Sequence, residues 1–183
     1  IVAAVVIAVG AVFAAVAGVT AIVLPAGVTV PAGDFVLPEM DAIGGVFALA
    51  VAISGVACSV YAVGYLPGHA TGKNQVQTGL HFAALVALFY SMLGVIGAKD
   101  TYGFLFWWEL MTLSSFVLVM FDGDRKEVLH AAVGYLVLMH IGFFLLLGGF
   151  VAPQGGEAFF AGRGMTVPAF LLFLGGFGLK AGI

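Results

Sequence analysis

Two ionisable residues of opposite charge stand inside apolar stretches of this sequence. Glu109 lies in "FLFWWELMTLSS", and Lys180 lies in "GFGLKAGI". Even a lenient insertion scale assigns a cost of about 2.5–3.5 kcal/mol to an Asp or Lys at the centre of a membrane helix. Such residues therefore usually face other helices, pair with each other or line an ion path. One acid and one base in separate helices are a natural buried pair.

Each of the two residues also has a simpler interpretation. Glu109 could be a structural anchor bonded to a neighbouring hydroxyl, and Thr112 stands three positions later on the same helix face. Lys180 could extend to a membrane interface if its helix ended near Ile183. The glycines of "LGGFGLKAG" favour a weakened or broken helix instead, and transporters place ion sites at broken helices. We therefore expect Glu109 and Lys180 to be functional.

Histidine could extend this chemistry, because a neutral imidazole both donates and accepts and has an unperturbed pKa of about 6.5. His140, in "YLVLMHIGFF", lies near the middle of an apolar stretch. It could relay protons, or it could be a core histidine bonded to a backbone carbonyl or a serine. His130 lies ten residues earlier, about 15 Å along the same helix and close to a charged turn.

The sequence contains no pattern typical of a metal or cofactor site. No two of its four histidines are three or four residues apart, so no pair shares one helix face. It has no CxxC, no haem-binding pair and no phosphate-binding loop. We expect no metal and no cofactor. A net charge of −3 without a basic patch gives no indication of nucleic-acid binding.

The segments around these residues are too apolar for a soluble domain. Hydrophobic residues make up 63% of the 183 residues and charged residues 8%, and the mean hydropathy is +1.20. A soluble domain carries about 25% charged residues, so this composition places the chain in a membrane. Six apolar runs approach the roughly 20 residues that span a bilayer as a helix. They are 1–24, 42–66, 77–98, 101–121, 127–152 and 166–183.

Uninterrupted apolar runs favour helices, because barrel strands would alternate with period two. The sequence therefore predicts an all-α polytopic membrane protein of about six transmembrane helices, with residues 1–183 in one transmembrane domain. We expect a multi-pass protein of the cell (inner) membrane. The connection 25–41 has "VTV" and "FVL" between Pro and Gly and predicts a small hairpin. The single cysteine, Cys58, is predicted to be a buried structural thiol.

Four of these segments together resemble a known family. "FLFWWELMTLSSFVLVMF" resembles the fifth helix of the antiporter-like membrane subunits of complex I, Mrp cation antiporters and group 4 hydrogenases. "GFGLKAGI" resembles the start of that family's broken seventh helix. "EVLHAAVGYLVLMHIGFFLLL" is similar to the sixth helix, and "MDAIGGVFALAVAISGVACSVYAVGYL" is similar to the third. Within the family, the resemblance is strongest to the branch of hydrogenase-4 component B and the formate hydrogenlyase membrane subunit.

The resemblance implies a fold of about fourteen helices with two inverted repeats, each built around a broken helix. This chain would hold helices two to seven. In the family, a glutamate on the fifth helix and a lysine on the seventh form a charged pair, and Glu109 and Lys180 match these positions. The sixth helix commonly carries a further basic residue, a role open to His130 or His140, and we prefer His140 for its depth. Because both ends of the chain lie in apolar runs, where a charged terminus would be costly, we expect a fragment cut at both ends. The resemblance implies that it comes from the N-terminal part of the longer protein.

The function that the resemblance implies is proton translocation by a subunit of a redox-driven complex, of hydrogenase-4, formate hydrogenlyase or complex I type. The subunit would carry no redox centre, although the complex as a whole would be an oxidoreductase. Its partners would be the other membrane and redox subunits, the lipid bilayer, and protons or Na⁺. Two alternatives stay open: a non-transporting membrane scaffold whose charged pair only holds helices together, and an Mrp-type Na⁺/H⁺ antiporter subunit.

Overall fold

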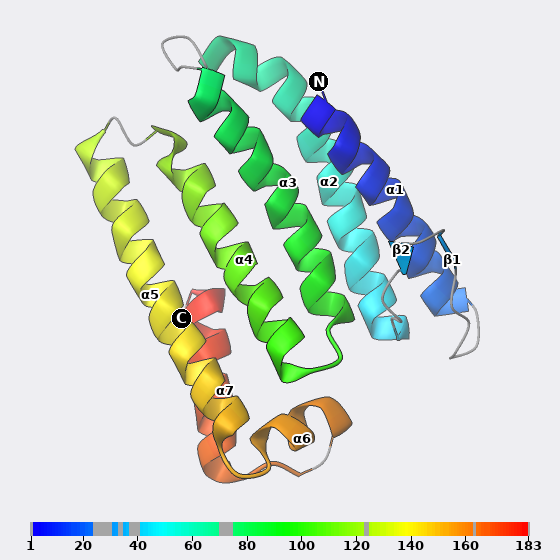
Figure 1. Ribbon diagram of the computed structural model, residues 1–183, viewed down its shortest axis with the longest axis vertical. Coiled ribbons are helices and arrows are strands. Elements are labelled where there is room, and N and C mark those ends of the chain that lie inside the picture. Colours follow the sequence, from blue (N-terminus) through cyan, green and yellow to red (C-terminus); the bar gives the residue numbers. More distant parts are fainter. Residues whose placement is uncertain are drawn as a thin grey trace. The chain divides into compact units, whose positions relative to one another are not determined.

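The computed structural model describes residues 2–23, 31–32, 35–36, 41–69, 75–122, 125–162 and 164–182 (Figure 1). Its helices are α1 (Val2–Val23), α2 (Ala42–His69), α3 (Gln75–Gly97), α4 (Thr101–Val119), α5 (Lys126–Val151), α6 (Gly155–Ala161) and α7 (Val167–Ala181), with a 3-10 turn η1 (Met120–Asp122) after α4. Two-residue strands β1 (Pro31–Ala32) and β2 (Phe35–Val36) lie between α1 and α2. The chain forms two compact units, Ile1–Ala98 and Lys99–Ile183.

Helices α1 to α5 are each long and apolar enough to cross a membrane. Helix α7 is also apolar, but its 15 residues are fewer than the roughly 20 that span a bilayer. The prediction of an all-α, multi-pass membrane protein is confirmed. Helices α1 to α5 and α7 begin and end within three residues of the six apolar runs, and the short helix α6 lies between the last two runs.

In the first unit, α1 packs closely against α2, and α3 packs against both. The closest approach is between Gly18 and Gly45, where a Cβ on Gly18 would lie 2.7 Å from the Gly45 carbonyl oxygen. Small residues permit such close backbone packing in membrane helices. Asp41 begins α2, since its Oδ1 accepts a hydrogen bond of 2.7 Å from the Gly44 amide.

Two predictions for the first unit can be compared with the structure. Strands β1 and β2 pair antiparallel, so a short hairpin is present, although the "VTV" stretch at 28–30 lies outside the described residues. Cys58 is exposed, so the prediction of a buried thiol is wrong. An amphipathic or apolar helix buries only the stripe that faces its neighbours. On α2 this stripe runs through Ala48, Ala52, Ser59 and Ala62, and Cys58 falls outside it.

In the second unit, α5 packs against both α4 and α7. Asp100 caps α4, because its Oδ1 accepts a hydrogen bond of 2.8 Å from the Gly103 amide. An aromatic cluster joins four helices, with neighbouring ring centroids 4.9–6.2 Å apart. Its members are Phe104 and Trp108 of α4, Phe150 of α5, Phe159 of α6, and Phe173 and Phe177 of α7. The cluster holds α6 and α7 against α4 and α5.

Helix α7 is continuous through its glycines, so the predicted break before Lys180 is absent from the described helix. The glycines serve helix packing instead. A Cβ on Gly176 would lie 2.6 Å from Leu146 Cγ and 2.9 Å from the Gly142 carbonyl oxygen of α5. Helix α7 ends at Ala181, and Gly182 adopts a φ of 89°, which suits a glycine after a helix end. Figure 1 shows that this end lies beside the middle of α5.

Candidate functional site

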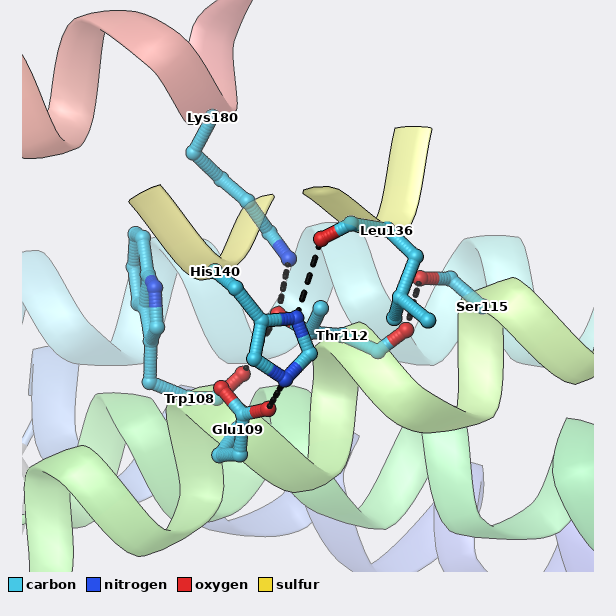
Figure 2. A network of polar contacts seen from close by, with 7 residues as sticks. All are labelled: Trp108, Glu109, Thr112, Ser115, Leu136, His140 and Lys180. Atoms are coloured by element: carbon cyan, nitrogen blue, oxygen red, sulfur yellow. Dashed lines mark hydrogen bonds and ion pairs between the residues drawn. The ribbon is translucent and has the colours of Figure 1, made fainter. Parts of the chain in front are cut away.

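Lys180 reaches across from α7 to α4 (Figure 2). It lies in the last turn of α7, and its Nζ donates a hydrogen bond of 2.7 Å to Oγ1 of Thr112. The same nitrogen lies 5.5 Å from the centroid of the Trp108 ring, within range of a cation–π contact. The side chain therefore has partners on another helix of the same unit. It does not extend away from the helices, as the interfacial interpretation required.

Glu109 pairs with His140. It lies on α4, one turn before Thr112, and its Oε1 is 3.0 Å from Nε2 of His140 on α5. The Glu109 side chain is 23% exposed and the His140 side chain 38%. Thr112 does not bond Glu109, because its hydroxyl donates to the Trp108 carbonyl at 3.1 Å and accepts from Lys180. The alternative of an anchor through Thr112 is therefore not supported, and the partner of Glu109 comes from another helix.

The two contacts of the His140 ring limit the protonation states that His140 and Glu109 can adopt together. Nδ1 lies 2.9 Å from the Leu136 carbonyl oxygen. A carbonyl oxygen only accepts, so this hydrogen bond requires a proton on Nδ1. The contact between Nε2 and Oε1 then needs one proton, carried either by the imidazole as an imidazolium or by Glu109 as a carboxylic acid. His140 thus has both a backbone partner, as a core histidine would, and an acidic partner, as a proton relay would.

Glu109 and Lys180 are close but do not touch. Among the described residues no ion pair joins them, and Thr112 takes the contact with the Lys180 amine. Glu109 is nevertheless near enough to act electrostatically on the Lys180 ammonium. The second carboxylate oxygen, Oε2 of Glu109, is buried and has no hydrogen-bond partner within the described part of the chain. The site therefore brings together an acid, an imidazole and an amine from three helices, with the acid in contact with the imidazole and close to the amine.

The other predicted residue, His130, lies apart from this site. It is exposed near the start of α5, about 15 Å from His140 along the helix axis.

A further polar contact joins α4 to α5 one turn after Thr112. Ser115 makes a 2.6 Å hydrogen bond with the Tyr135 hydroxyl of α5 and donates to the Thr112 carbonyl. Within the described residues, no group of three or more His, Cys, Asp or Glu is placed to hold a metal ion.

Sequence reasoning missed the partners of Lys180. The sequence suggests Thr112 only as a possible partner of Glu109, and no spacing argument connects Trp108 to Lys180. Both lie on one face of α4, because they are four residues apart. The sequence signal for a cation site is the pair of Trp108 and Thr112, an aromatic ring and a hydroxyl four residues apart and next to the acidic Glu109.

Fold and site together define a multi-pass helical membrane protein with partly buried ionisable groups between its helices. The chain is similar to an uncharacterized protein of Mycobacterium tuberculosis, with 34% identity over 153 residues. It is also similar to hydrogenase-4 component B of Escherichia coli, with 28% identity over 154 residues, and to Na(+)/H(+) antiporter subunit A1 of Staphylococcus aureus, with 29% identity over 112 residues. These matches cover 79%, 79% and 61% of this chain.

Over the matched residues, the chain matches the family of antiporter-like membrane subunits, which confirms the predicted resemblance. The matched segments are 23%, 22% and 13% of the lengths of the three relatives, so the chain spans about a quarter of these proteins or less. No protein-family model matches the chain, and no solved structure matches it at a significant level.

Proposed function

We propose that this chain is part of a proton-translocating antiporter-like membrane subunit of a redox-driven complex, of hydrogenase-4, formate hydrogenlyase or complex I type. One relative is named as a component of hydrogenase-4 and another as an antiporter subunit, which supports both transport and the presence of partner subunits. The chain itself would carry no redox centre. Electron transfer in partner subunits would supply the energy.

The observation that carries this proposal is the position of Glu109, which contacts His140 and lies close to Lys180. Ionisable residues inside membrane segments are rare and usually belong to ion paths. The single proton in the contact between Glu109 and His140 can reside on either residue. Moving the Lys180 ammonium changes the electrostatic field at this contact, and thereby changes which residue holds the proton.

The proposed mechanism uses this coupling. A conformational change that is driven by the partner subunits would move Lys180 relative to Glu109. The proton would then pass between Glu109 and His140 and leave toward the next polar group. Glu109 and Lys180 act as a charged pair through space, and His140 is the further basic group. We keep His140 in preference to His130, because only His140 contacts Glu109 in the described structure.

The test is Glu109→Gln in the full-length protein within its intact complex. The amide keeps the shape of the side chain but can neither ionise nor share the proton with His140. We expect proton transport to fall about tenfold or more, as is typical for loss of a proton-transferring group. Electron transfer and subunit content should fall less. Glu109→Asp should be milder, because it keeps the charge and only shortens the reach.

Glu127→Gln is the matched control, since Glu127 is an exposed carboxylate in the first turn of α5 in the same unit. Transport is measured as acidification of membrane vesicles and divided by the rate of electron transfer. Unchanged transport in Glu109→Gln would contradict the proposal. Loss of assembled subunit in Glu109→Gln, with Glu127→Gln normal, would favour the scaffold alternative.

The antiporter relative supports a second candidate, an Mrp-type Na⁺/H⁺ antiporter subunit. Carboxylates bind both protons and Na⁺, so Glu109 fits either ion. The two functions differ in what drives the proton. Proton movement that depends on added NaCl, but neither on KCl nor on an electron donor, would identify the antiporter.

A further inference from the structure

The Lys180 amine is held by two side chains from one face of α4. Its Nζ donates to Thr112 Oγ1 at 2.7 Å and lies 5.5 Å from the Trp108 ring centroid (Figure 2). Thr112 is fully buried at 0% exposure, and Trp108 is 8% exposed. The buried Thr112 hydroxyl and the buried Trp108 ring lie on neighbouring turns of α4, and both contact the Lys180 amine. We name Trp108 and Thr112 the lysine dock.

Thr112 can hold Lys180 but cannot exchange a proton with it in this geometry. The Thr112 hydroxyl donates its only proton to the Trp108 carbonyl at 3.1 Å. Its oxygen is therefore left as an acceptor for the Lys180 N–H. An ammonium and a neutral amine both carry N–H groups, so the dock accepts Lys180 in either state. This separates Thr112 from Glu109 and His140, which share a proton.

We infer that Thr112, supported by Trp108, is a positioning residue that holds the Lys180 amine one helical turn from Glu109. The inference rests on the proposed function and deepens it. Thr112 follows Glu109 by three residues, about 4.5 Å along the helix axis. At this place the lysine acts on the Glu109 carboxylate through space without forming a contact ion pair. The carboxylate therefore stays bonded to His140.

The contact with Lys180 requires a particular kind of side chain at position 112. A hydrogen-bond acceptor must be present there, whereas a methyl group alone fills the same space without binding the amine. Thr112→Val keeps the volume and removes the acceptor, and Thr112→Ser keeps the acceptor and removes a methyl group. A residue that mattered only for packing would tolerate Val better than Ser. A residue that positions Lys180 would tolerate Ser better than Val.

The experiment compares these variants in the full-length protein within its complex, by proton transport per electron transferred. We expect Thr112→Val to lower transport roughly tenfold, the effect of losing one hydrogen bond to a charged group. Thr112→Ser should restore it to within about twofold. Ser114→Ala is the matched control, because Ser114 is buried on the same helix and, among the described residues, its hydroxyl donates only to the backbone carbonyls of Leu110 and Met111. It should transport normally.

If Thr112→Val does not assemble, Thr112→Cys against Thr112→Ser gives the same comparison, because a thiol has nearly the shape of a hydroxyl but accepts hydrogen bonds weakly. Equal transport in Val and Ser variants, or in Cys and Ser variants, would overturn the inference. Glu109→Gln, measured in parallel, separates the two proposals. A defective Glu109→Gln with a normal Thr112→Val refutes the dock alone. A normal Glu109→Gln with a defective, serine-rescued Thr112→Val refutes only the proposed role of Glu109.

Discussion

The packing of α7 on α5 makes a quantitative prediction at Gly176. A Cβ there would lie 2.6 Å from Leu146 Cγ and 2.9 Å from the Gly142 carbonyl oxygen. Carbon atoms pack best at about 3.5–4.0 Å, so the two helices would have to separate by about 1 Å. Leu146 is 0% exposed, and its nearest atom is the branch point of the side chain, so it has little freedom to yield. We expect Gly176→Ala to destabilise the protein by about 1–3 kcal/mol, the usual cost of overpacking.

Gly148→Ala is the matched control at the same helix interface. Its Cβ would lie 3.6 Å from Leu172 Cδ1, an ordinary contact. Both substitutions change helix propensity in the same direction and by a similar amount. The difference between them therefore isolates the steric clash. The assay is the midpoint temperature of heat denaturation of the purified full-length protein in detergent. Equal midpoints for the two variants would show that α5 and α7 do not pack this closely.

Gly176→Ala also tests whether the packing of α7 on α5 positions Lys180 for its contact with Thr112. Lys180 follows Gly176 by four residues and so lies on the same face of α7. A displacement of about 1 Å would stretch its 2.7 Å hydrogen bond to Thr112 beyond the range of a good bond. Proton transport should fall in Gly176→Ala and stay normal in Gly148→Ala. Destabilisation without loss of transport would mean that this hydrogen bond is not needed.

Two further predictions concern residues outside the site. Asp100→Ala should lower the free energy of unfolding by about 1 kcal/mol through loss of the α4 cap. Asp100→Asn should keep the stability, because an amide oxygen also accepts the capping hydrogen bond. Equal losses in the two variants would contradict the capping role. Cys58→Ser should leave transport within about twofold, because Cys58 is exposed and lies outside the packed stripe of α2. Complete loss of transport with normal assembly would reveal a function for that face.

Much of the architecture could be predicted from the sequence, because it depends on local properties. The length and apolar character of each run determine where a membrane helix begins and ends, whatever its neighbours are. The conspicuous cost of charge in such a run marked Glu109 and Lys180, and the depth of His140 in its run marked that residue. The resemblance to antiporter-like subunits depended on the same segments and was confirmed by the relatives.

Which residues contact each other was decided by the tertiary structure. Glu109 could have bonded Thr112 or Lys180, but α5 brings His140 to it. The glycines of α7 were compatible with a broken helix, and only the close approach of Leu146 shows that they serve packing. Cys58 was apolar enough to be buried, but the stripe that α2 turns to its neighbours excludes it. These contacts depend on which faces of neighbouring helices pack together, and the sequence periodicity of a single helix does not determine its neighbours.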